Sequence, residues 1–382
     1  MKICFWGDIG RALTDNTSGG GELQIALLAK ALSKCGHEIV ILDYQTSEDF
    51  VTVDGIKVIK INGKNNGIPI IGTFFKILPQ FYRTLVDQQA DIYYSRIRDF
   101  RHIIVYWAAK KIKAKFVLGI ASDLDVLNFS MRLKYHYLAN YTGLWGIING
   151  LGIEIVYPFL TRKSDMVLVQ HAGQQTILNK KGITSKIFLN LFAPEKIPSI
   201  HKQNNNVFVH VGELQKRKGF IEFFEVVKKS PDHFFKVIGQ PSGKSGFLYF
   251  EELKSLENST LSGRLSHSQT MQEIANSTAL ISTSPMEGFP NIFLESWACG
   301  VPVLSLYVDP GGIIEKNDLG VVAHGKMDIL LNALDTINQN DEFKSRSQAY
   351  VENNHVLNSK RIKEIDDLFC GLLVMPQKPC IS

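Results

Sequence analysis

Cysteines are few in this chain, and no two of them form a closely spaced pair. The 382 residues contain five, with no CxxC sequence, namely Cys4, Cys35, Cys299, Cys370 and Cys380. An odd, scattered set of this kind indicates neither a disulfide framework nor a zinc site. We therefore expect a protein of the reducing cytoplasm.

Long apolar runs are missing as well. The first residues, Met1 to Asp8, lack the apolar core and the cleavage site of a signal peptide, so no secretion signal is expected. The most apolar stretch, Gly143 to Leu160, is interrupted by Glu154 and by five glycines or prolines. A membrane-spanning helix needs about 20 apolar residues. We expect this stretch to be buried or interfacial.

The chain also has little excess of positive over negative charge, with a net charge of only +5. That excess is too low to argue for nucleic acid, although a local basic face could meet anionic lipid. The short aromatic stretch Ile68 to Tyr82 precedes a series of basic residues, which are Arg83, Arg96, Arg98, Arg101, Lys110, Lys111, Lys113 and Lys115. This pairing predicts a peripheral membrane surface, with a core helix followed by solvated helix faces as the alternative.

The length predicts two domains, at about 150 residues per domain. The first unit reads as strand Lys2 to Trp6, a glycine-rich loop, helix Glu22 to Lys34 and strand Glu38 to Tyr44, which is a βαβ unit. Further short apolar strands are expected at Ile92 to Tyr94, Lys115 to Ile120 and Met166 to Gln170. The N-terminal half is therefore α/β.

A linker rich in proline and polar residues follows Asn190, and a second α/β alternation begins after it. Its expected strands are Val207 to Val211, Phe234 to Ile238, Ala279 to Ser282 and Val301 to Leu306. Its expected helices are Phe220 to Lys229, Ser268 to Asn276, Pro290 to Cys299 and Met327 to Asn338. We predict two Rossmann-like doubly wound domains facing across a cleft, residues 1–197 and 198–348, with 349–382 crossing back to the first domain.

The most informative segment runs from Ser284 to Val303 and reads as strand end, loop, helix and strand. Pro290 suits the first helical position, which would leave the amides of Asn291 and Ile292 free at a positive helix end. Such an end binds phosphate. Glu287 precedes the helix and Glu295 lies about 7 Å along it. Two carboxylates flanking an anion site match a nucleotide sugar, which carries hydroxyls on both sides of its diphosphate.

Glu287 and Glu295, in EGFPNIFLESWACGVPV, resemble the E-x7-E motif of retaining glycosyltransferases of family four. The similarity extends to SGGGEL at residues 18–23, SDMVLVQ at 164–170, VGELQKRKG at 211–219 and DPGG at 309–312. It implies the GT-B fold, with Glu287 on the donor sugar and Glu295 on the ribose. The diphosphate and the rest of the donor would contact the backbone of Gly212, Gly288, Phe289, Asn291 and Ile292.

Arg217 and Lys218 follow a buried strand and could neutralise a leaving diphosphate. The resemblance carries this role over to Lys218. For Arg217 a solvated basic turn is an equal alternative, since many relatives have an arginine where this chain has Glu213.

Gly19, Gly20 and Gly21 allow close approach of the backbone to a ligand at the start of a helix. In the resembling family this loop lies over the donor phosphates and the acceptor. A dinucleotide-binding fingerprint is the rival interpretation, with Asp43 as its acidic residue, but the glycines are contiguous rather than spaced as G-x-G-x-x-G.

Asp123 and Asp125 follow a strand and could form the metal-binding DxD pair of the other glycosyltransferase architecture. Since that architecture does not explain the second α/β domain, Asp123 is interpreted as an acceptor-side catalytic residue. Ser122 stands where many relatives have a histidine. His171 lies at the edge between the domains, and a lone histidine there is more often structural.

These residues predict a cytoplasmic retaining glycosyltransferase, peripheral on the inner face of the membrane. It would move a hexose-type sugar from a nucleotide-diphosphate sugar to a glycan or polyprenyl-linked acceptor in surface polysaccharide synthesis, without a metal or cofactor and without nucleic acid. A GT-B nucleotide-sugar epimerase, a phosphorylase and a non-catalytic nucleotide-sugar-binding protein remain alternatives.

Overall fold

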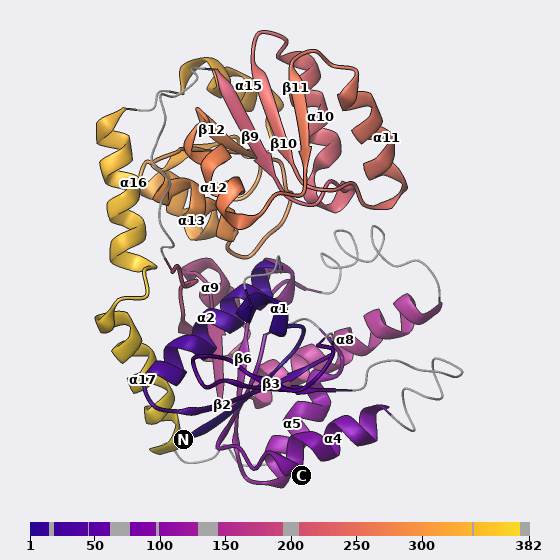
Figure 1. The fold of residues 1–382 in the computed structure, drawn as a ribbon, viewed down its shortest axis with the longest axis vertical. Helices are drawn as coiled ribbons and strands as arrows, with labels where there is room; N and C mark the ends of the chain where they lie inside the picture. Colours follow the sequence, from indigo (N-terminus) through magenta and orange to yellow (C-terminus); the bar gives the residue numbers. More distant parts are fainter. Residues whose placement is uncertain are drawn as a thin grey trace.

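The computed structural model describes residues 1–14, 19–44, 46–61, 77–96, 99–128, 144–193, 206–337 and 340–374. The chain forms two α/β domains, one above the other in Figure 1, and two C-terminal helices run along both of them. The predicted linker between Asn190 and Val207 falls largely outside the described residues, as do the stretch from Ile68 to Lys76 and Cys380.

The N-terminal domain is built on an eight-stranded sheet in the order β3-β4-β2-β1-β5-β6-β7-β8, parallel except at the β3–β4 pair. Its strands are β1 (Lys2–Trp6), β2 (Glu38–Asp43), β3 (Phe50–Val51), β4 (Lys57–Lys60), β5 (Ile92–Ser95), β6 (Lys115–Gly119), β7 (Met166–Val169) and β8 (Lys186–Ile187). Apolar residues alternate between the two faces: Ile3 and Phe5 enter one core, and Cys4 and Trp6 the other. Burial on both faces is what a parallel sheet requires.

Helices cover both faces of this sheet. They are α1 (Gly10–Leu13), α2 (Gly20–Lys34), α4 (Leu78–Asp87), α5 (His102–Lys111), α8 (Leu144–Lys163) and α9 (Ala172–Lys180). Helix α2 packs on one face, and α4, α5 and α8 pack on the other. Residues 144–160 of the apolar stretch that was expected to be buried or interfacial form most of α8. No described helix has the length and apolar character of a membrane span.

The basic residues expected on a membrane-facing surface do not all lie on the surface. Arg96 is 4% exposed and donates to Asn190, Lys115 is 5% exposed, and Arg101 forms a two-point ion pair with Asp99. The prediction of a surface position is therefore wrong for Arg96 and Lys115, which are buried, and Arg101 is held by Asp99. Lys111, Lys113 and Arg83 are exposed or partly exposed, and Arg98 lies outside the described residues.

The C-terminal domain carries a six-stranded parallel sheet in the order β11-β10-β9-β12-β13-β14. The strands are β9 (Val207–Val211), β10 (Phe234–Ile238), β11 (Ser259–Gly263), β12 (Ala279–Ser282), β13 (Val303–Ser305) and β14 (Gly320–Val322). The helices are α10 (Phe220–Lys229), α11 (Gly243–Lys254), α12 (His267–Ala275), α13 (Asn291–Ala298), α14 (Ile313–Lys316) and α15 (Met327–Thr336). Short 3-10 turns lie at Asp123–Asp125 (η2), Lys216–Lys218 (η4) and Pro310–Gly312 (η5).

Two final helices connect the domains along one side of the molecule (Figure 1). Helix α16 (Asp341–Asn354) packs against α13 of the C-terminal domain. Helix α17 (Ser359–Val374) packs against α2 and inserts Ile365, Phe369 and Leu372 into the N-terminal core. The chain therefore returns to the N-terminal domain between these two helices.

One expected helix start is corrected. Pro290 is not the first helical residue but the residue before it, with an extended backbone (φ −66°, ψ 123°). Its carbonyl accepts a hydrogen bond from Phe293 at 3.1 Å. The helix therefore begins at Asn291, because the proline ring fixes φ but leaves ψ free to turn the chain into the loop.

Candidate functional site

Lys218 and Glu287 meet at the carboxyl end of the second sheet. The Lys218 Nζ lies 2.5 Å from Glu287 Oε1, and the Ser284 hydroxyl donates to the same oxygen at 2.6 Å. Their side chains are 30% and 21% exposed, so solvent reaches the pair. A cation and a carboxylate are thus held side by side at the end of β12.

Gly219 fixes the position of Lys218. Its φ of 72° lies in the left-handed region, where glycine is favoured. A β-carbon at this position would lie 1.9 Å from the Thr283 carbonyl oxygen, and the Thr283 hydroxyl donates to the Gly219 carbonyl at 2.8 Å. The backbone of the basic loop therefore rests directly on the end of β12, beside the loop that carries Glu287.

Arg217 points to a different partner. Its guanidinium lies 3.2 Å from Glu213 Oε2, and the two side chains are 43% and 45% exposed. Gly212, also predicted to contact the donor, packs closely on Gly239, whose β-carbon would lie 1.8 Å from the Gly212 oxygen. The structure brings Lys218 to Glu287 but holds Arg217 on the surface beside Glu213.

Two helix N-termini converge near this pair. Gly19 caps α2, and the Asn291 side-chain amide at the start of α13 donates to the Gly20 carbonyl at 3.0 Å. The Asn291 oxygen accepts from Asn190 at 2.8 Å and from Gln24 at 3.1 Å. Helix N-termini carry partial positive charge, so two of them together favour an anion such as a diphosphate.

Glu295 lies on the buried face of α13. It is 8% exposed, and its Oε1 is 3.3 Å from Nε2 of His267, the first residue of α12. Sequence reasoning missed His267, because nothing in its spacing links it to Glu295. The imidazole is 45% exposed and the Glu295 side chain 11%, so the histidine covers the carboxylate on its solvent side.

Gly288 lies where the two domains approach closely at the site. A β-carbon there would lie 2.0 Å from the Gln170 side-chain amide and 2.6 Å from the Ala121 carbonyl oxygen. The next residue, Phe289, is 4% exposed, and its carbonyl accepts from Asn190. The Glu287 loop is therefore pressed against the carboxyl ends of β6 and β7.

Asp123 meets the Glu287 loop from the N-terminal domain. Its amide donates to the Glu287 carbonyl at 3.3 Å. Its carboxylate accepts from His171 Nε2 at 3.0 Å and from the Gln174 side-chain amide at 2.9 Å. His171 is 5% exposed, and it packs near Gly311 of the opposite domain. His171, which the sequence indicates as a structural histidine, thus positions the carboxylate of Asp123, the predicted acceptor-side residue.

The alternative DxD interpretation finds no support in the hydrogen bonds. Asp125 Oδ2 accepts from the amides of Ala121 and Ser122 at 3.1 and 3.0 Å, and the side chain is buried. Asp125 therefore caps its own turn, whereas Asp123 binds His171. Asp43 accepts from the amide of Gly10 at 2.6 Å and so holds the start of α1.

His210, near the end of β9, is a further residue that sequence reasoning missed. It is 5% exposed, stacks on Phe223 at 4.3 Å between ring centroids, and has Nδ1 3.2 Å from the Ile281 carbonyl oxygen. Burial, and then the Lys218 charge, lower its pKa to about 4, against the opposing effect of the carbonyl contact. The ring is neutral at pH 7 and ties β9 to β12 beneath the basic loop.

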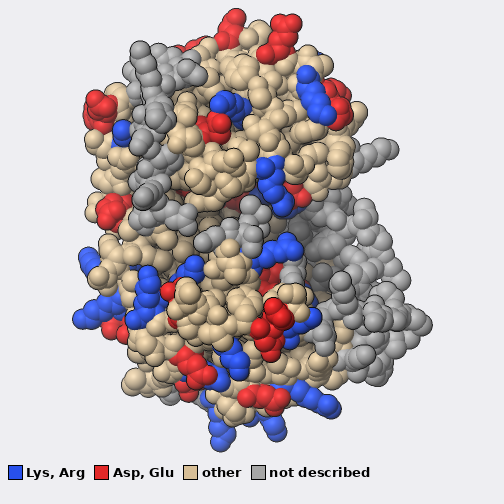
Figure 2. Space-filling view, in the orientation of Figure 1, with Lys and Arg blue, Asp and Glu red and all other residues tan. Residues whose placement is uncertain are grey.

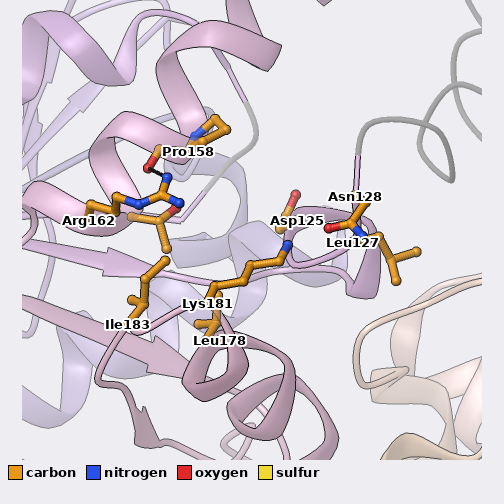
Figure 3. Close-up of a pocket in the computed structure, with 9 residues that line it drawn as sticks. Asp125, Leu127, Asn128, Pro158, Arg162, Leu178, Lys181 and Ile183 are labelled. Atoms are coloured by element: carbon orange, nitrogen blue, oxygen red, sulfur yellow. Dashed lines mark hydrogen bonds between the residues drawn. The ribbon is translucent and has the colours of Figure 1, made fainter.

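A cavity of about 310 Å³ lies in the N-terminal domain beside Asp125 (Figure 3). Leu127, Pro158, Leu178 and Ile183 supply its apolar lining. Figure 3 shows Lys181 extending toward Asp125 and Leu127, while Arg162 lies across from it on α8. The cavity therefore combines apolar walls with two cationic side chains.

Residues 193–357 match the model of the family described as glycosyl transferases group 1. An uncharacterized glycosyltransferase from Haemophilus influenzae is 24% identical in an alignment of 349 positions that covers 87% of this chain and 91% of the relative. The matched family region spans the basic loop, Glu287, Glu295 and α16.

Solved structures match the whole chain. Sucrose-phosphate synthase from Thermosynechococcus elongatus superposes with a TM-score of 0.74 at 14% identity, covering 98% of this chain and 99% of that one. The fold is GT-B. HepE from Anabaena, solved with UDP and glucose, matches with a TM-score of 0.69 at 16% identity, over 98% of this chain and all of that one. WaaG, a glycosyltransferase involved in lipopolysaccharide biosynthesis, matches at 0.68 and 15%, over 97% and 99%. These matches show the predicted two-domain GT-B architecture over the chain, and residues 193–357 are similar to the glycosyl transferases of group 1.

Proposed function

We propose that this protein transfers a sugar from a nucleotide-diphosphate sugar to a glycan or lipid-linked acceptor, with retention of the anomeric configuration. The observation that carries the proposal is the Lys218–Glu287 pair beside two converging helix N-termini, with Asp123 of the opposite domain on the Glu287 loop. Cations and helix dipoles suit a diphosphate, and the nearby carboxylates suit sugar hydroxyls. The family match and the GT-B fold support the same assignment.

In this mechanism, the bond between the anomeric carbon and the diphosphate oxygen breaks first. Lys218 and the ends of α2 and α13 stabilise the negative charge that develops on the diphosphate. The acceptor oxygen then bonds to the same face of the sugar, and its proton passes to the departing phosphate oxygen. Glu287 offers a carboxylate to the sugar, where positive charge develops, and Glu295 binds the ribose. No step in this scheme uses a metal ion.

The direct test is a screen of nucleotide sugars by mass spectrometry, with a membrane extract as the acceptor. UDP-glucose belongs in the first panel because HepE was solved with UDP and glucose. A glycosylated product supports the proposal. An epimerised donor, a sugar phosphate formed from inorganic phosphate, or nucleotide-sugar binding without chemistry would instead identify an epimerase, a phosphorylase or a binding protein.

Retention and metal independence have separate readouts. NMR of the product is expected to give the same anomeric configuration as the donor. Turnover in EDTA is expected to persist, because Lys218 and the helix ends supply the positive charge that a divalent ion would otherwise provide. Inversion, or a loss in EDTA that Mn²⁺ restores, would contradict the mechanism.

The cavity beside Asp125 is proposed as part of the acceptor site. Its apolar walls and the cations Arg162 and Lys181 fit an acceptor that joins an anionic group to an apolar chain, such as a polyprenyl phosphate. Arg162→Gln is expected to raise KM for such an acceptor about tenfold and leave the donor KM unchanged. Equal changes in the acceptor KM and the donor KM would contradict the assignment of this cavity to the acceptor site.

Association with an anionic membrane is a further part of the proposal. Exposed apolar side chains lie on the packed helices α5 and α8, with Trp107 at 52%, Ile155 at 76% and Phe159 at 41%. Basic residues end both helices: Lys111 and Arg162 are exposed and Lys163 is partly exposed, whereas Lys110 pairs with Asp165 at 2.9 Å. Each surface lysine or arginine can contribute about 1 kcal/mol at an anionic membrane.

Vesicle co-sedimentation tests this association. Pelleting is expected with phosphatidylglycerol vesicles at low salt and not with phosphatidylcholine vesicles. Ile155→Glu is expected to reduce it at least about tenfold. Val53→Glu is the matched control, since Val53 is fully exposed on the β3–β4 hairpin. Equal pelleting of the two variants would contradict the assigned surface.

A further inference from the structure

A histidine, an aspartate and a cysteine meet where α17 docks on the N-terminal domain. His37 precedes β2, and its Nε2 lies 2.6 Å from Asp366 Oδ1. The Cys370 thiol lies 3.3 Å from the same oxygen. One ligand-type atom from each of the three side chains falls within 4.8 Å of the other two.

The packing of α17 on the N-terminal core and the turn before β2 place these three side chains. Asp366 and Cys370 are four residues apart on α17, which puts them on one face of the helix. Phe369, between them, is fully buried in the N-terminal core. His37 is held by the tight turn that joins α2 to β2, in which its amide donates to the Leu32 carbonyl at 3.3 Å. The cluster is therefore preorganised by the docking of α17.

The spacing fits a four-coordinate zinc ion. Zinc bonds of about 2.0 to 2.3 Å in tetrahedral geometry separate neighbouring ligand atoms by about 3.3 to 3.7 Å. The sulfur and the carboxylate oxygen already have this spacing, and the imidazole and carboxylate need to separate by about 1 Å. The Asp366 side chain is 31% exposed and Cys370 is exposed, so a water molecule can supply the fourth ligand.

We propose that His37, Asp366 and Cys370 bind one Zn²⁺, which clamps α17 to the N-terminal domain. Nitrogen, oxygen and sulfur ligands together favour zinc over magnesium or calcium, which prefer oxygen alone. On binding, the His37 ring gives up its hydrogen bond to Asp366, and the Cys370 thiol releases its proton to solvent. The ion has no part in sugar transfer.

The clamp has a structural purpose that follows from the path of the chain. Helix α16 packs on the C-terminal domain and α17 on the N-terminal one, so residues 355–358 connect the two attachments. Zinc at the α17 end would add a second attachment to the pairing of Val356 with Phe192 in that connection. Binding a ligand only in the folded state raises thermal stability by mass action.

The experiment uses tag-free, full-length protein that has been stripped with EDTA and then titrated with Zn²⁺. One equivalent is expected to bind and raise Tm. Cys370→Ser and His37→Gln are each expected to weaken zinc binding about 100-fold and to abolish the rise. Cys35→Ser is the matched control, because Cys35 lies in the same region, with Sγ 4.0 Å from the Ile362 carbonyl, but is not part of the cluster.

Cobalt provides a second readout that does not depend on stability. Co²⁺ is expected to give a thiolate-to-metal charge-transfer band in the wild type and in Cys35→Ser, but not in Cys370→Ser. Less than about a tenth of an equivalent of bound zinc, or binding that both cluster variants retain, would overturn the proposal. Either result would leave the donor site untouched, because no residue is shared between the two.

Discussion

At the scale of single residues, Gly219 decides where the Lys218 ammonium lies. Gly219→Ala combines a left-handed backbone with a β-carbon 1.9 Å from a backbone oxygen that cannot move away. We expect a loss of about 2 to 4 kcal/mol in the free energy of unfolding, measured in urea, together with weaker nucleotide binding.

Gly182→Ala is the control for this variant. Its φ of 69° is equally left-handed, but no atom lies within 4 Å of the added β-carbon. It is expected to cost only about 1 kcal/mol and to leave nucleotide binding intact. Equal losses for both glycines would show that backbone strain alone, and not contact with β12, matters at Gly219.

Buried histidines give the molecule a pH dependence that also begins with single residues. Burial lowers the pKa of His102 to about 3 despite the opposing charge of Asp99, so the ring is neutral in the folded state. In the unfolded chain it binds a proton below about pH 6.5. The contribution of the neutral His102 ring to the free energy of unfolding is therefore fully present above that pH, and it is lost as the pH drops from 6.5 toward 3.

His102→Phe isolates this effect. The wild type is expected to lose about 2 kcal/mol more than the variant between pH 7 and pH 5, measured by urea unfolding at each pH. Phenylalanine keeps the ring that packs edge-on against Trp6 at 5.1 Å. Parallel pH curves for the two proteins would mean that the buried imidazole is protonated in the folded state.

At the scale of elements, the contact between the Glu287 loop and the ends of β6 and β7 joins the two halves of the site. Gly288→Ala places a β-carbon 2.6 Å from the Ala121 carbonyl oxygen and must push the loop away. We expect kcat/KM to fall at least about tenfold, because small displacements of reacting groups are costly, while Tm changes little. Gly371→Ala on α17, with open space around it, is expected to keep full activity.

Most elements near the site could be predicted from the sequence. Strand Val207–Val211 and helix Phe220–Lys229 lie where their apolar patterns indicate, because both faces of a parallel sheet need such runs. Pro290 was assigned one position too far into its helix, since both positions tolerate a proline. Helix α8 gave no clear helical pattern, because Pro158 and its glycines interrupt it.

Contacts between distant segments could not be predicted. His171 meets Asp123 from 48 residues away, and His267 meets Glu295 from 28, so neither pair has a sequence spacing that reveals it. The cluster of His37, Asp366 and Cys370 joins residues as far as 329 apart, so no local sequence spacing indicates it. The roles of Arg217 and of the contiguous glycines stay predictions.

At the scale of the whole molecule, the face shown in Figure 2 carries charges of both signs side by side. Figure 2 shows acidic and basic side chains interspersed over the visible described surface, with no extended stripe of one sign. This agrees with the small net charge of +5.

The central claim is that Glu287 and Glu295 lie at opposite ends of one bound nucleotide sugar. Calorimetry with the nucleotide diphosphate, combined with steady-state rates, tests it most directly. Glu287→Gln is expected to lower kcat by about 10² to 10³-fold while nucleotide affinity stays within a few-fold, because its charge acts on the developing positive sugar. Glu295→Gln is expected to weaken nucleotide binding and leave kcat nearly unchanged, since ribose contacts are the same in ground and transition states. Variants that both bind nucleotide and turn over like the wild type would contradict the account.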